Sequence, residues 1–382
     1  MRVAHVVAHS PFNEGTGTVA YYYAKGLQDL GVDVEVFVPD KGVPQKDYDQ
    51  SIYCYFHSFL SIQNAFLTPD LLKLSGFDLV HLHNPYIFGS ELILLNLVRN
   101  QVPLVVTYHN DLIGRGVKGV LFLIYQKIFT PLLFKRADWI TFNSFDHAES
   151  SIFYEKIFKD KRDQLVEVPS GVDVESFKPG LASTKIREQF GFSNKDVVVL
   201  FVSSLDRAHV NKGLFFLLEA ISKLCDIDAL KLLVIGGGEM LTEYQSRASE
   251  LGIADKVKFS GRILHHQLPK YYNAGNLVVI PSIAESFGLA VAEGMACGLP
   301  AIATNNPGVR MVIQDNVSGF LVPYDDVPEL AGKIRELVEN PQLRKKMGVK
   351  GRKQIANNFT WKKSAKKLLN LYQELLPKSG SK

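Results

Sequence analysis

Cysteine and tryptophan are scarce in this sequence, with three and two residues among 382. Cys54, Cys225 and Cys297 are odd in number and have no metal-ligand spacing, which favours reduced thiols over a disulfide framework or a metal site. A secretion signal is also missing, because Met1 to Ala8 has no charged head, apolar middle or cleavage site. We therefore expect a cytoplasmic protein.

Long hydrophobic runs are missing as well, since no stretch reaches the roughly 20 apolar residues of a membrane-spanning helix. The most apolar segment, Val117 to Phe134, is interrupted by Gln126, Lys127 and Pro131. We expect ordinary helix packing for this segment. The protein is not expected to span a membrane.

Charge of one sign gathers in only one place. The net charge of +4 is too small to indicate a nucleic-acid partner. Between Arg344 and Lys367, however, there are ten Lys and Arg residues and no acidic residue. Such a stretch either meets the anionic inner face of a membrane peripherally or forms solvated helix faces, and we favour the solvated faces.

The chain is long enough for two domains of ordinary size, and its pattern repeats once. Val3 to Ala8 predicts a buried strand, Thr18 to Leu30 a helix and Val32 to Val38 a second strand, which together begin a βαβ unit. The same order returns later, in the strand Val197 to Val202, the helix Leu214 to Leu224 and the strand Leu230 to Ile235. We therefore predict two similar α/β units, joined by the turn-rich stretch Val166 to Pro179.

The segment from Glu285 to Leu299 has the features of a ligand site. It follows a strand-like run, Asn276 to Ile280, so Glu285 is predicted at the carboxyl end of a buried strand, where α/β sheets bind ligands. A helix should begin near Phe287, and its unpaired N–H groups favour an anion such as phosphate. Glu293 lies among small and apolar residues of that helix, where a carboxylate needs a partner.

The phrase from Val278 to Pro300 resembles the donor-site signature of retaining glycosyltransferase family four, whose members have the GT-B fold. Further phrases with the same resemblance are spread over essentially the whole chain: Asp78 to Pro85, Val105 to His109, Val168 to Asp173, Phe259 to Arg262 and Phe359 to Trp361. The resemblance implies an α/β protein with two Rossmann-like domains that face each other across a cleft. It implies an acceptor-side domain over residues 1–170, a nucleotide-sugar donor domain over 171–360, and a last helix within 361–382 that crosses back to the first domain.

The resemblance also assigns two cations to the leaving diphosphate. Lys212 matches the family's phosphate lysine, just before Gly213. Arg207 is a looser match, because Ser203-Ser204 replaces the usual Gly-Arg pair. Either Arg207 supplies the guanidinium from a shifted position or that charge is lost, and we favour the first alternative. Such cations stabilise the negative charge that grows on the phosphate oxygens.

Other site residues follow from the same resemblance. Glu293 would accept hydrogen bonds from the ribose hydroxyls, Glu285 would contact the donor sugar, and His109 matches the histidine that hydrogen-bonds the transferred sugar. Main-chain groups would complete the site: Phe287, Gly288 and Leu289 at the sugar and distal phosphate, Arg262 and Ile263 along the base, and Gly15 and Gly17 at the phosphate.

The resemblance therefore implies transfer of a hexose-type sugar, with retention of configuration, from a nucleotide-diphosphate donor to a hydroxyl acceptor. We expect a front-face route without a covalent intermediate, a cofactor or a metal. The donor base and the acceptor stay open. The apolar segments Tyr53 to Leu67 and Val117 to Phe134 are compatible with a lipid-linked acceptor.

A dinucleotide-binding oxidoreductase is the first alternative. Gly15-x-Gly17-x-x-Ala20, with Asp40 after the second predicted strand, formally fits the NAD fingerprint. The first predicted strand ends near Ala8, however, whereas the fingerprint needs its first glycine directly in the turn after the strand.

Two further alternatives stay closer to the transferase. The triplets Asp47-Tyr48-Asp49 and Asp226-Ile227-Asp228 would suit a metal-dependent transferase, but neither follows a strand that would aim both carboxylates at one ion. A catalytically inactive nucleotide-sugar-binding protein of the same fold is the other alternative. Four residues retained together argue against it: Glu285, Glu293, Lys212 and His109.

Overall fold

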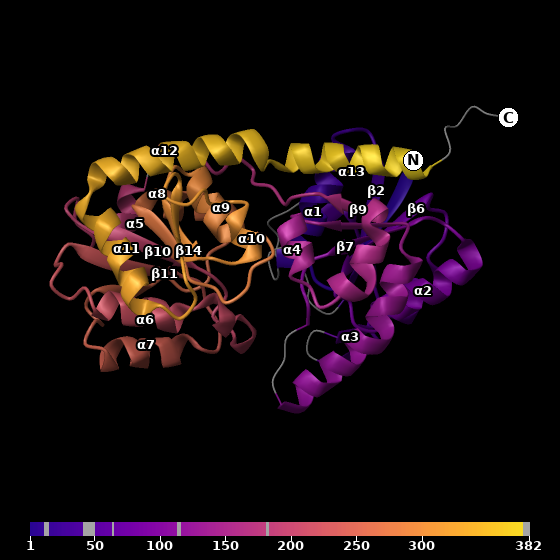
Figure 1. Ribbon diagram of the computed structural model, residues 1–382, viewed down its shortest axis with the longest axis horizontal. Helices are drawn as coiled ribbons and strands as arrows, with labels where there is room; N and C mark the ends of the chain where they lie inside the picture. The colour runs from indigo at the N-terminus through magenta and orange to yellow at the C-terminus, as the bar shows by residue number, and fades with distance from the viewer. Residues whose placement is uncertain (11–14, 41–49, 63–64, 113–115, 181–182, 377–382) are drawn as a thin grey trace. The chain divides into compact units, whose positions relative to one another are not determined.

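The computed structural model describes residues 1–10, 15–40, 50–62, 65–112, 116–180 and 183–376 (Figure 1). Its contacts divide the chain into two compact units. Unit 1 contains Met1–Ser170 and Trp361–Lys382, and unit 2 contains Gly171–Thr360. Each unit is built around one parallel sheet, of seven strands in unit 1 and six in unit 2, so the predicted α/β class is confirmed.

The sheet of unit 1 has the order β3-β2-β1-β6-β7-β8-β9, and all neighbouring strands are parallel. Its strands are β1 (Arg2–Val6), β2 (Asp33–Pro39), β3 (Tyr53–Phe56), β6 (Leu79–Asn84), β7 (Leu104–Tyr108), β8 (Trp139–Phe142) and β9 (Leu165–Glu167). A separate antiparallel hairpin is made by β4 (Leu60–Ile62) and β5 (Ala65–Leu67). The helices of unit 1 are α1 (Gly15–Gln28), α2 (Gly89–Asn100), α3 (Gly116–Arg136), α4 (Phe145–Glu149) and α13 (Trp361–Leu375). Short helical turns complete it: η1 (Gln50–Ile52), η2 (Pro69–Lys73), η3 (Tyr154–Phe158) and η4 (Lys159–Gln164).

The two faces of this sheet differ in chemistry. Successive side chains of a strand point to opposite faces, so alternate residues share one face. One face contributes apolar side chains to the core of unit 1, among them Ala4, Val6, Val80, Leu82, Val106 and Tyr108. The other face has polar residues at paired or alternate positions: His5, His81, His83, Thr107 and Thr141. All five are buried, so they need partners within the protein.

The last helix completes unit 1. Along α13 the buried positions recur at helical spacing, as expected for an amphipathic helix on a core: Trp361, Ser364, Ala365, Leu368, Leu371 and Tyr372. It packs on α1, where the Trp361 ring stacks on Tyr22 with centroids 4.7 Å apart (Figure 1). The Ser364 hydroxyl donates to the Pro169 carbonyl at 2.6 Å. The predicted return of the last helix to the first domain is confirmed.

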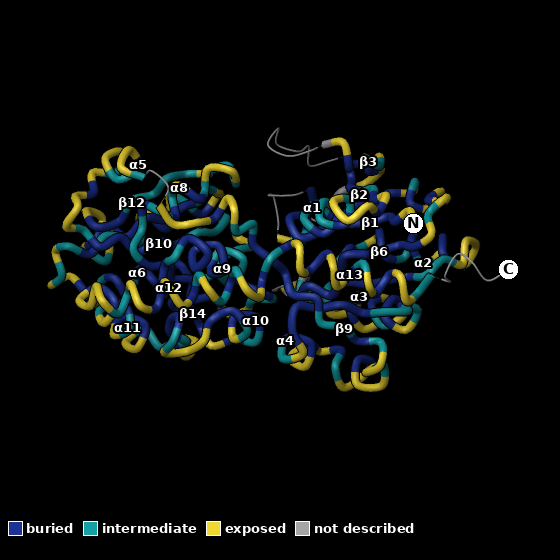
Figure 2. Tube along the Cα trace, turned by 90° about the horizontal axis from the view of Figure 1, so that it is seen from above, coloured by how far each residue is buried: buried dark blue, intermediate teal, exposed yellow. Residues whose placement is uncertain are grey.

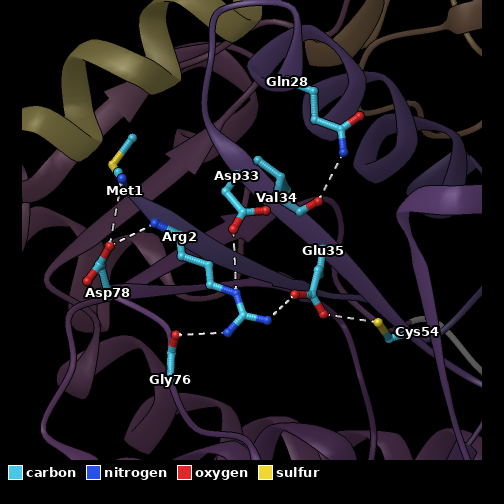
Figure 3. A network of polar contacts seen from close by, with 9 residues as sticks. All are labelled: Met1, Arg2, Gln28, Asp33, Val34, Glu35, Cys54, Gly76 and Asp78. Carbon is cyan, nitrogen blue, oxygen red and sulfur yellow. Dashed lines mark hydrogen bonds and ion pairs between the residues drawn. The ribbon is translucent and has the colours of Figure 1, made fainter.

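A polar network fixes the amino ends of three strands of unit 1 (Figure 3). Arg2 begins β1 and pairs with Asp33 and Glu35 of β2, while its backbone N–H donates to Asp78 Oδ2 at 2.7 Å. Cys54 Sγ lies 3.1 Å from Glu35 Oε2. Parallel sheets bind ligands at the carboxyl ends of their strands, and this network lies at the opposite ends. We therefore interpret it as structural, because it joins neighbouring strands.

The sheet of unit 2 has the order β12-β11-β10-β13-β14-β15, again with parallel neighbours. Its strands are β10 (Val197–Val202), β11 (Leu230–Ile235), β12 (Val257–Phe259), β13 (Leu277–Ile280), β14 (Ala301–Thr304) and β15 (Gly319–Val322). Its helices are α5 (Thr184–Gln189), α6 (Leu214–Ser222), α7 (Leu241–Glu250), α8 (Leu268–Ala274), α9 (Leu289–Ala296), α10 (Pro307–Arg310), α11 (Val327–Glu339) and α12 (Pro341–Asn358), with the turns η5 (Arg207–Lys212) and η6 (His265–Gln267).

Continuous apolar runs explain the central strands of unit 2. Four of them, β10, β11, β13 and β14, are buried along nearly their whole length, as expected for a parallel sheet covered on both faces (Figure 2). The strand order reverses between β10 and β13, which makes the carboxyl ends of these two strands the switch point where open α/β sheets bind ligands.

The segment Val117 to Phe134 was expected to pack as an ordinary helix, and only one side of it does so. This segment lies in α3, and one side of the helix is buried through Tyr125, Leu133 and Phe134. The opposite side leaves large apolar side chains exposed to 41–60%: Val120, Leu121, Leu123, Ile124, Ile128, Phe129 and Leu132. Apolar content alone cannot tell these two sides apart. Among the described residues, no helix has the length and hydropathy needed to cross a membrane.

The basic stretch from Arg344 to Lys367 is divided between α12 and α13. Some of its cations bond backbone carbonyls: Arg344 bonds Val338 at 2.7 Å, and Arg352 bonds Phe177 at 2.6 Å and Ala296 at 2.9 Å. These cations therefore hold unit 2 together.

Candidate active site

Two loops of unit 2 bring a lysine and a glutamate together at the switch point. Lys212 ends η5, which follows β10, and Glu285 lies in the loop after β13. Lys212 Nζ lies 2.8 Å from Glu285 Oε1, and the Ser282 hydroxyl donates to the same oxygen at 2.7 Å. The loops are also joined where the Ile283 N–H donates to the Asn211 carbonyl at 2.8 Å. The Glu285 side chain is only 9% exposed, so the ion pair compensates a nearly buried carboxylate.

The helix after Glu285 begins two residues later than predicted, at Leu289 instead of near Phe287. Gly288 is its N-cap, with φ of +80°, a left-handed conformation that glycine adopts without steric cost. This conformation lets the chain turn from the Glu285 loop into α9. The amide groups of the turn and of the first residues of α9 thus follow directly on the Lys212–Glu285 pair.

Glu293 has two partners that the sequence did not indicate. His265 Nε2 lies 3.0 Å from Glu293 Oε1, and the Tyr272 hydroxyl donates to Glu293 Oε2 at 3.0 Å. Glu293 itself is 8% exposed, so both oxygens of a buried carboxylate are satisfied. Burial and the Glu293 carboxylate raise the pKa of Tyr272 well above its usual value, which keeps the hydroxyl protonated as a donor.

The predicted base-binding residues lie on the same loop as His265. Arg262 and Ile263 stand between β12 and η6, whose first residue is His265. The Arg262 backbone approaches the glycine turn after β11, where a Cβ on Gly237 would lie 3.1 Å from the Arg262 nitrogen. Arg262 and Ile263 therefore shortly precede His265, one of the two partners of Glu293, in the chain.

Arg207 does not share the partner of Lys212. Its side chain is 78% exposed, and its Nε lies 3.6 Å from Glu239 Oε1. Its backbone N–H donates to the same carboxylate at 3.2 Å. In this structure Arg207 and Lys212 therefore stand at opposite ends of η5 with different carboxylates.

In unit 1, His109 directly follows β7 and is 3% exposed. Its backbone N–H donates to the Asn84 carbonyl at 3.0 Å, and its Nε2 lies 3.0 Å from His83 Nδ1. Burial lowers the pKa of His109 to about 3, so this imidazole is neutral at physiological pH. A neutral imidazole can donate one hydrogen bond and accept one.

Gly15 and Gly17 lie in the first turn of α1, at the carboxyl end of β1. A Cβ on Gly17 would lie 2.4 Å from the Ser10 carbonyl oxygen, so only glycine fits there. A Cβ on Gly15 would meet no atom within 4 Å. Close packing of the chain against itself thus explains Gly17, and it leaves Gly15 unexplained.

Only one of the two aspartate triplets considered for a metal site lies within the described residues. Asp47 and Asp49 lie outside the described residues. Asp226 is paired through both oxygens with Arg335, at 2.8 Å each, so its carboxylate is already engaged at the surface.

Several polar partners were not expected from the sequence: Ser282 beside Glu285, His265 and Tyr272 beside Glu293, and the network of His5, His81, His83 and Tyr372 that leads to His109. The alternation His81-x-His83 on a buried strand is the one local signal, because both side chains then share a face of the sheet. The remaining partners come from segments far apart in the sequence.

Two family models match the chain. The model described as Glycosyltransferase Family 4 matches residues 13–176, and the model described as Glycosyl transferases group 1 matches residues 182–354. Together they cover most of the chain. The chain therefore belongs to the glycosyltransferases of family four, and the resemblance seen in the sequence is confirmed.

The curated relatives are also named as glycosyltransferases. The D-inositol 3-phosphate glycosyltransferase of Corynebacterium jeikeium is 35% identical over 220 residues, which is 55% of this chain and 52% of that protein. The chain spans about half the length of the first curated relatives it matches. An NAD-dependent oxidoreductase, the first alternative above, finds no support in these matches.

Solved structures show the same fold. The sucrose-phosphate synthase of Thermosynechococcus elongatus is 22% identical, with a TM-score of 0.81 and 98% of each chain covered. Anabaena HepE, solved in complex with UDP and glucose, is 20% identical, with a TM-score of 0.81, and covers 98% of this chain and 100% of its own. The predicted GT-B fold is confirmed.

Proposed function

We propose that the protein transfers a hexose-type sugar from a nucleotide-diphosphate donor to a hydroxyl acceptor, with retention of configuration. The observation that carries this proposal is the Lys212–Glu285 pair, 2.8 Å apart at the switch point of unit 2 and just before α9. A cation and a helix N-terminus there suit a leaving diphosphate. The complex of the structural neighbour HepE with UDP and glucose favours a uridine donor.

Charge stabilisation is the main task of unit 2 in this proposal. The Lys212 ammonium has three N–H donors, of which Glu285 takes one, and the others can meet the phosphate oxygens as the glycosidic bond breaks. The amides of Phe287, Gly288 and Leu289 add fixed dipoles. Arg207 would add a second cation only after its side chain leaves Glu239.

In this proposal the carboxylates of Glu285 and Glu293 bind the transferred sugar and the ribose. Glu285 accepts from hydroxyls of the transferred sugar and supports the positive charge that develops at the anomeric carbon. Glu293 accepts from the ribose hydroxyls with lone pairs that His265 and Tyr272 leave open. In unit 1, neutral His109 can form a hydrogen bond with a sugar hydroxyl.

The proposed chemistry is a front-face substitution. The bond from the anomeric carbon to the phosphate oxygen breaks, and its electron pair stays on the diphosphate. The acceptor hydroxyl attacks from the same face and gives its proton to that phosphate oxygen. No covalent enzyme intermediate forms, and Lys212 with the helix amides takes the place of a metal ion.

A donor screen followed by product analysis tests this proposal. The protein is incubated with UDP-, GDP- and ADP-hexoses, release of nucleotide is measured with and without EDTA, and the anomeric configuration of the product is read by NMR. Retained configuration and EDTA-resistant turnover support the proposal. An inverted product, or loss of turnover in EDTA, would contradict it, and binding without turnover would identify an inactive sugar-nucleotide binder.

We also propose that unit 1 contacts an anionic membrane peripherally, through the exposed apolar side of α3. Ile124, Ile128 and Leu132 on this side are 47–54% exposed. The helix α2, which contacts α3 (Figure 1), also has two exposed apolar residues, Leu95 and Val98, at 58% and 74%. Contiguous apolar patches of this kind on a protein surface mark interaction sites.

Charge favours a lipid surface as the partner. The sequence of α3 contains no acidic residue, and Lys127 and Lys135 are exposed on it. Lysines beside apolar side chains suit anionic headgroups, each contributing about 1 kcal/mol near such a surface. A second copy of the same face would place lysines near lysines. A membrane contact of this kind would also suit a lipid-linked acceptor.

Vesicle co-sedimentation tests the membrane contact. Binding to vesicles with anionic lipid should exceed binding to neutral vesicles and should fall with salt. The variant I124E/I128E should lower binding about tenfold or more, whereas V349E, at an exposed apolar residue of α12 in unit 2, should not. Equal loss in both variants, or a dimer that only I124E/I128E disrupts, would overturn the proposal.

A further inference from the structure

A chain of hydrogen bonds runs from the last helix to His109. The Tyr372 hydroxyl lies 3.1 Å from His5 Nε2, and His5 Nδ1 lies 3.1 Å from His83 Nε2. His83 Nδ1 lies 3.0 Å from His109 Nε2. Two imidazoles, His5 and His83, therefore connect Tyr372 to His109.

A branch leaves the same tyrosine in the other direction. The Tyr372 hydroxyl also hydrogen-bonds His81 Nδ1. His81 Nε2 lies 2.6 Å from Thr107 Oγ1, which lies 2.7 Å from Thr141 Oγ1. The Tyr372 hydroxyl thus belongs to two hydrogen-bonded branches, but it has only one proton and can donate to only one of them.

A metal site is the competing explanation of this cluster. Among the described residues, His5, His81 and His83 are buried and could place their ligand atoms within 4.8 Å of one another. However, each of their six ring nitrogens already has a hydrogen-bond partner: Tyr372, His83, Thr107, His5 or His109. A metal would need lone pairs that this network already uses, so hydrogen bonding accounts for the arrangement without an ion.

All four imidazoles of the network are neutral. Burial lowers the pKa of His5 and His109 to about 3, and it holds the pKa of His81 and His83 well below the usual value. A neutral imidazole carries one N–H and one lone pair. Each ring within the chain must therefore donate at one nitrogen and accept at the other, so the direction of one hydrogen bond sets all the others.

Only two proton orders satisfy the whole network. In the first, Tyr372 donates to His5, His5 to His83 and His83 to His109, which leaves the proton of His109 on Nδ1. In the second, every bond is reversed: His109 donates from Nε2, and Tyr372 donates to His81 instead. His109 Nδ1 is then a lone pair.

We propose that Tyr372, acting through His5 and His83, sets which nitrogen of His109 carries the proton. His109 thereby offers the sugar either a donor or an acceptor at Nδ1 while it stays uncharged. Tyr372 is a positioning residue in this scheme, because it acts on His109 through two other side chains. The consequence for activity rests on the proposed glycosyl transfer, whereas the proton order is a property of unit 1 alone.

Nitrogen NMR on the full-length protein tests the proton order directly. With 15N-labelled histidine, the ring nitrogens of His109, assigned with H109N, show which one is protonated. In the wild type we expect one ordered pattern at neutral pH. In Y372F, where phenylalanine can neither donate nor accept, we expect the His109 signals to move toward an average of the two tautomers or to the other tautomer.

A matched control is available in the same cluster. Tyr23 stands over the rings of His81 and His83, but its hydroxyl donates to the Val168 carbonyl at 2.9 Å. Y23F therefore removes a buried hydroxyl of unit 1 without breaking the chain, and it should leave the His109 signals in place. Thermal melting of both variants shows whether either has lost its fold.

Three results would overturn the proposal: unchanged His109 signals in folded Y372F, an equal change in Y23F, or one equivalent of tightly bound metal that H81A removes. If the transferase function holds, kcat should fall about three- to tenfold in Y372F, the worth of one hydrogen bond, with KM for the donor unchanged. Changed NMR signals without any turnover in the wild type would leave the relay standing and refute the proposed function instead.

Discussion

The two units bury their polar groups in different chemical states. Unit 1 holds four neutral imidazoles on one face of its sheet, all joined by hydrogen bonds to one another or to hydroxyls. Unit 2 holds two nearly buried carboxylates, Glu285 and Glu293, beside a lysine in one case and a histidine and a tyrosine in the other.

This difference follows from what each unit is proposed to bind. A diphosphate needs fixed cations, and a cation in a poorly solvated loop is held in place by a carboxylate. A sugar hydroxyl is neutral, so a neutral imidazole that donates or accepts one hydrogen bond is sufficient.

The largest expected effect of this difference is on stability toward acid. Burial lowers the pKa of His5 and His109 to about 3, from an ordinary value of 6.5. Between these values the unfolded chain binds more protons than the folded one, so their contribution is complete above pH 6.5 and is lost as the pH falls. Below pH 6.5 each histidine lowers the free energy of unfolding by about 1.4 kcal/mol per pH unit. The two together therefore lower it by about 5 kcal/mol at pH 4.5.

Tryptophan fluorescence can follow this loss, because Trp139 and Trp361, the two tryptophans of the chain, both belong to unit 1. During acid titration the fluorescence change should precede the loss of the remaining helical signal from unit 2. H109N should move the fluorescence midpoint to lower pH. A single transition shared by both signals, or none above pH 4, would contradict the prediction.

The next effect concerns the cation of unit 2. K212A should lower kcat about 10²-fold or more, because it removes a charge aimed at the leaving diphosphate and leaves Glu285 without its ion pair. K223A, at an exposed lysine after α6, is the matched control and should change kcat less than twofold. The measurement is kcat from steady-state kinetics at saturating donor. A decrease of kcat below about threefold in K212A would show that Lys212 is not part of the mechanism.

A smaller effect is expected from the second carboxylate. E293Q keeps the size of the side chain but removes the charge that His265 and Tyr272 face, and nucleotide affinity should fall about tenfold. Calorimetric titration with UDP measures the change. E239Q, whose carboxylate lies at the surface beside Arg207, should bind UDP normally. Equal affinities of E293Q and the wild type would mean that Glu293 is structural.

The smallest effect is expected at Arg207. Because this side chain is 78% exposed and beside Glu239, R207A should lower kcat only a few-fold. The result decides between the two alternatives left by Ser203-Ser204. A loss close to that of K212A would show that the Arg207 guanidinium moves to the diphosphate during the reaction.

The sequence was informative wherever one local pattern decides the structure. Buried parallel strands are continuous apolar runs, so β10 and β11 have the predicted bounds. The first helix, predicted to end at Leu30, ends at Gln28. The Glu285 loop was placed correctly because a strand, a turn and a helix follow one another in sequence.

The remaining features depend on contacts between distant segments. Nothing near Glu293 in the sequence shows that His265 and Tyr272 will face it. The exposed side of α3 could not be predicted because apolar residues occupy both sides of the helix. The histidine network needed the pairing of β1 with β6 and the arrival of Tyr372 from the end of the chain.

The path of α13 has a consequence for synthesis on the ribosome. The core of unit 1 includes Trp361 and Tyr372, which are translated only after every residue of unit 2. The nascent chain can therefore close unit 2, a continuous segment, while the sheet of unit 1 still exposes its histidine face. Unit 1, although made first, is finished last, and loss of the final helix by early termination would leave it without a lid over those imidazoles.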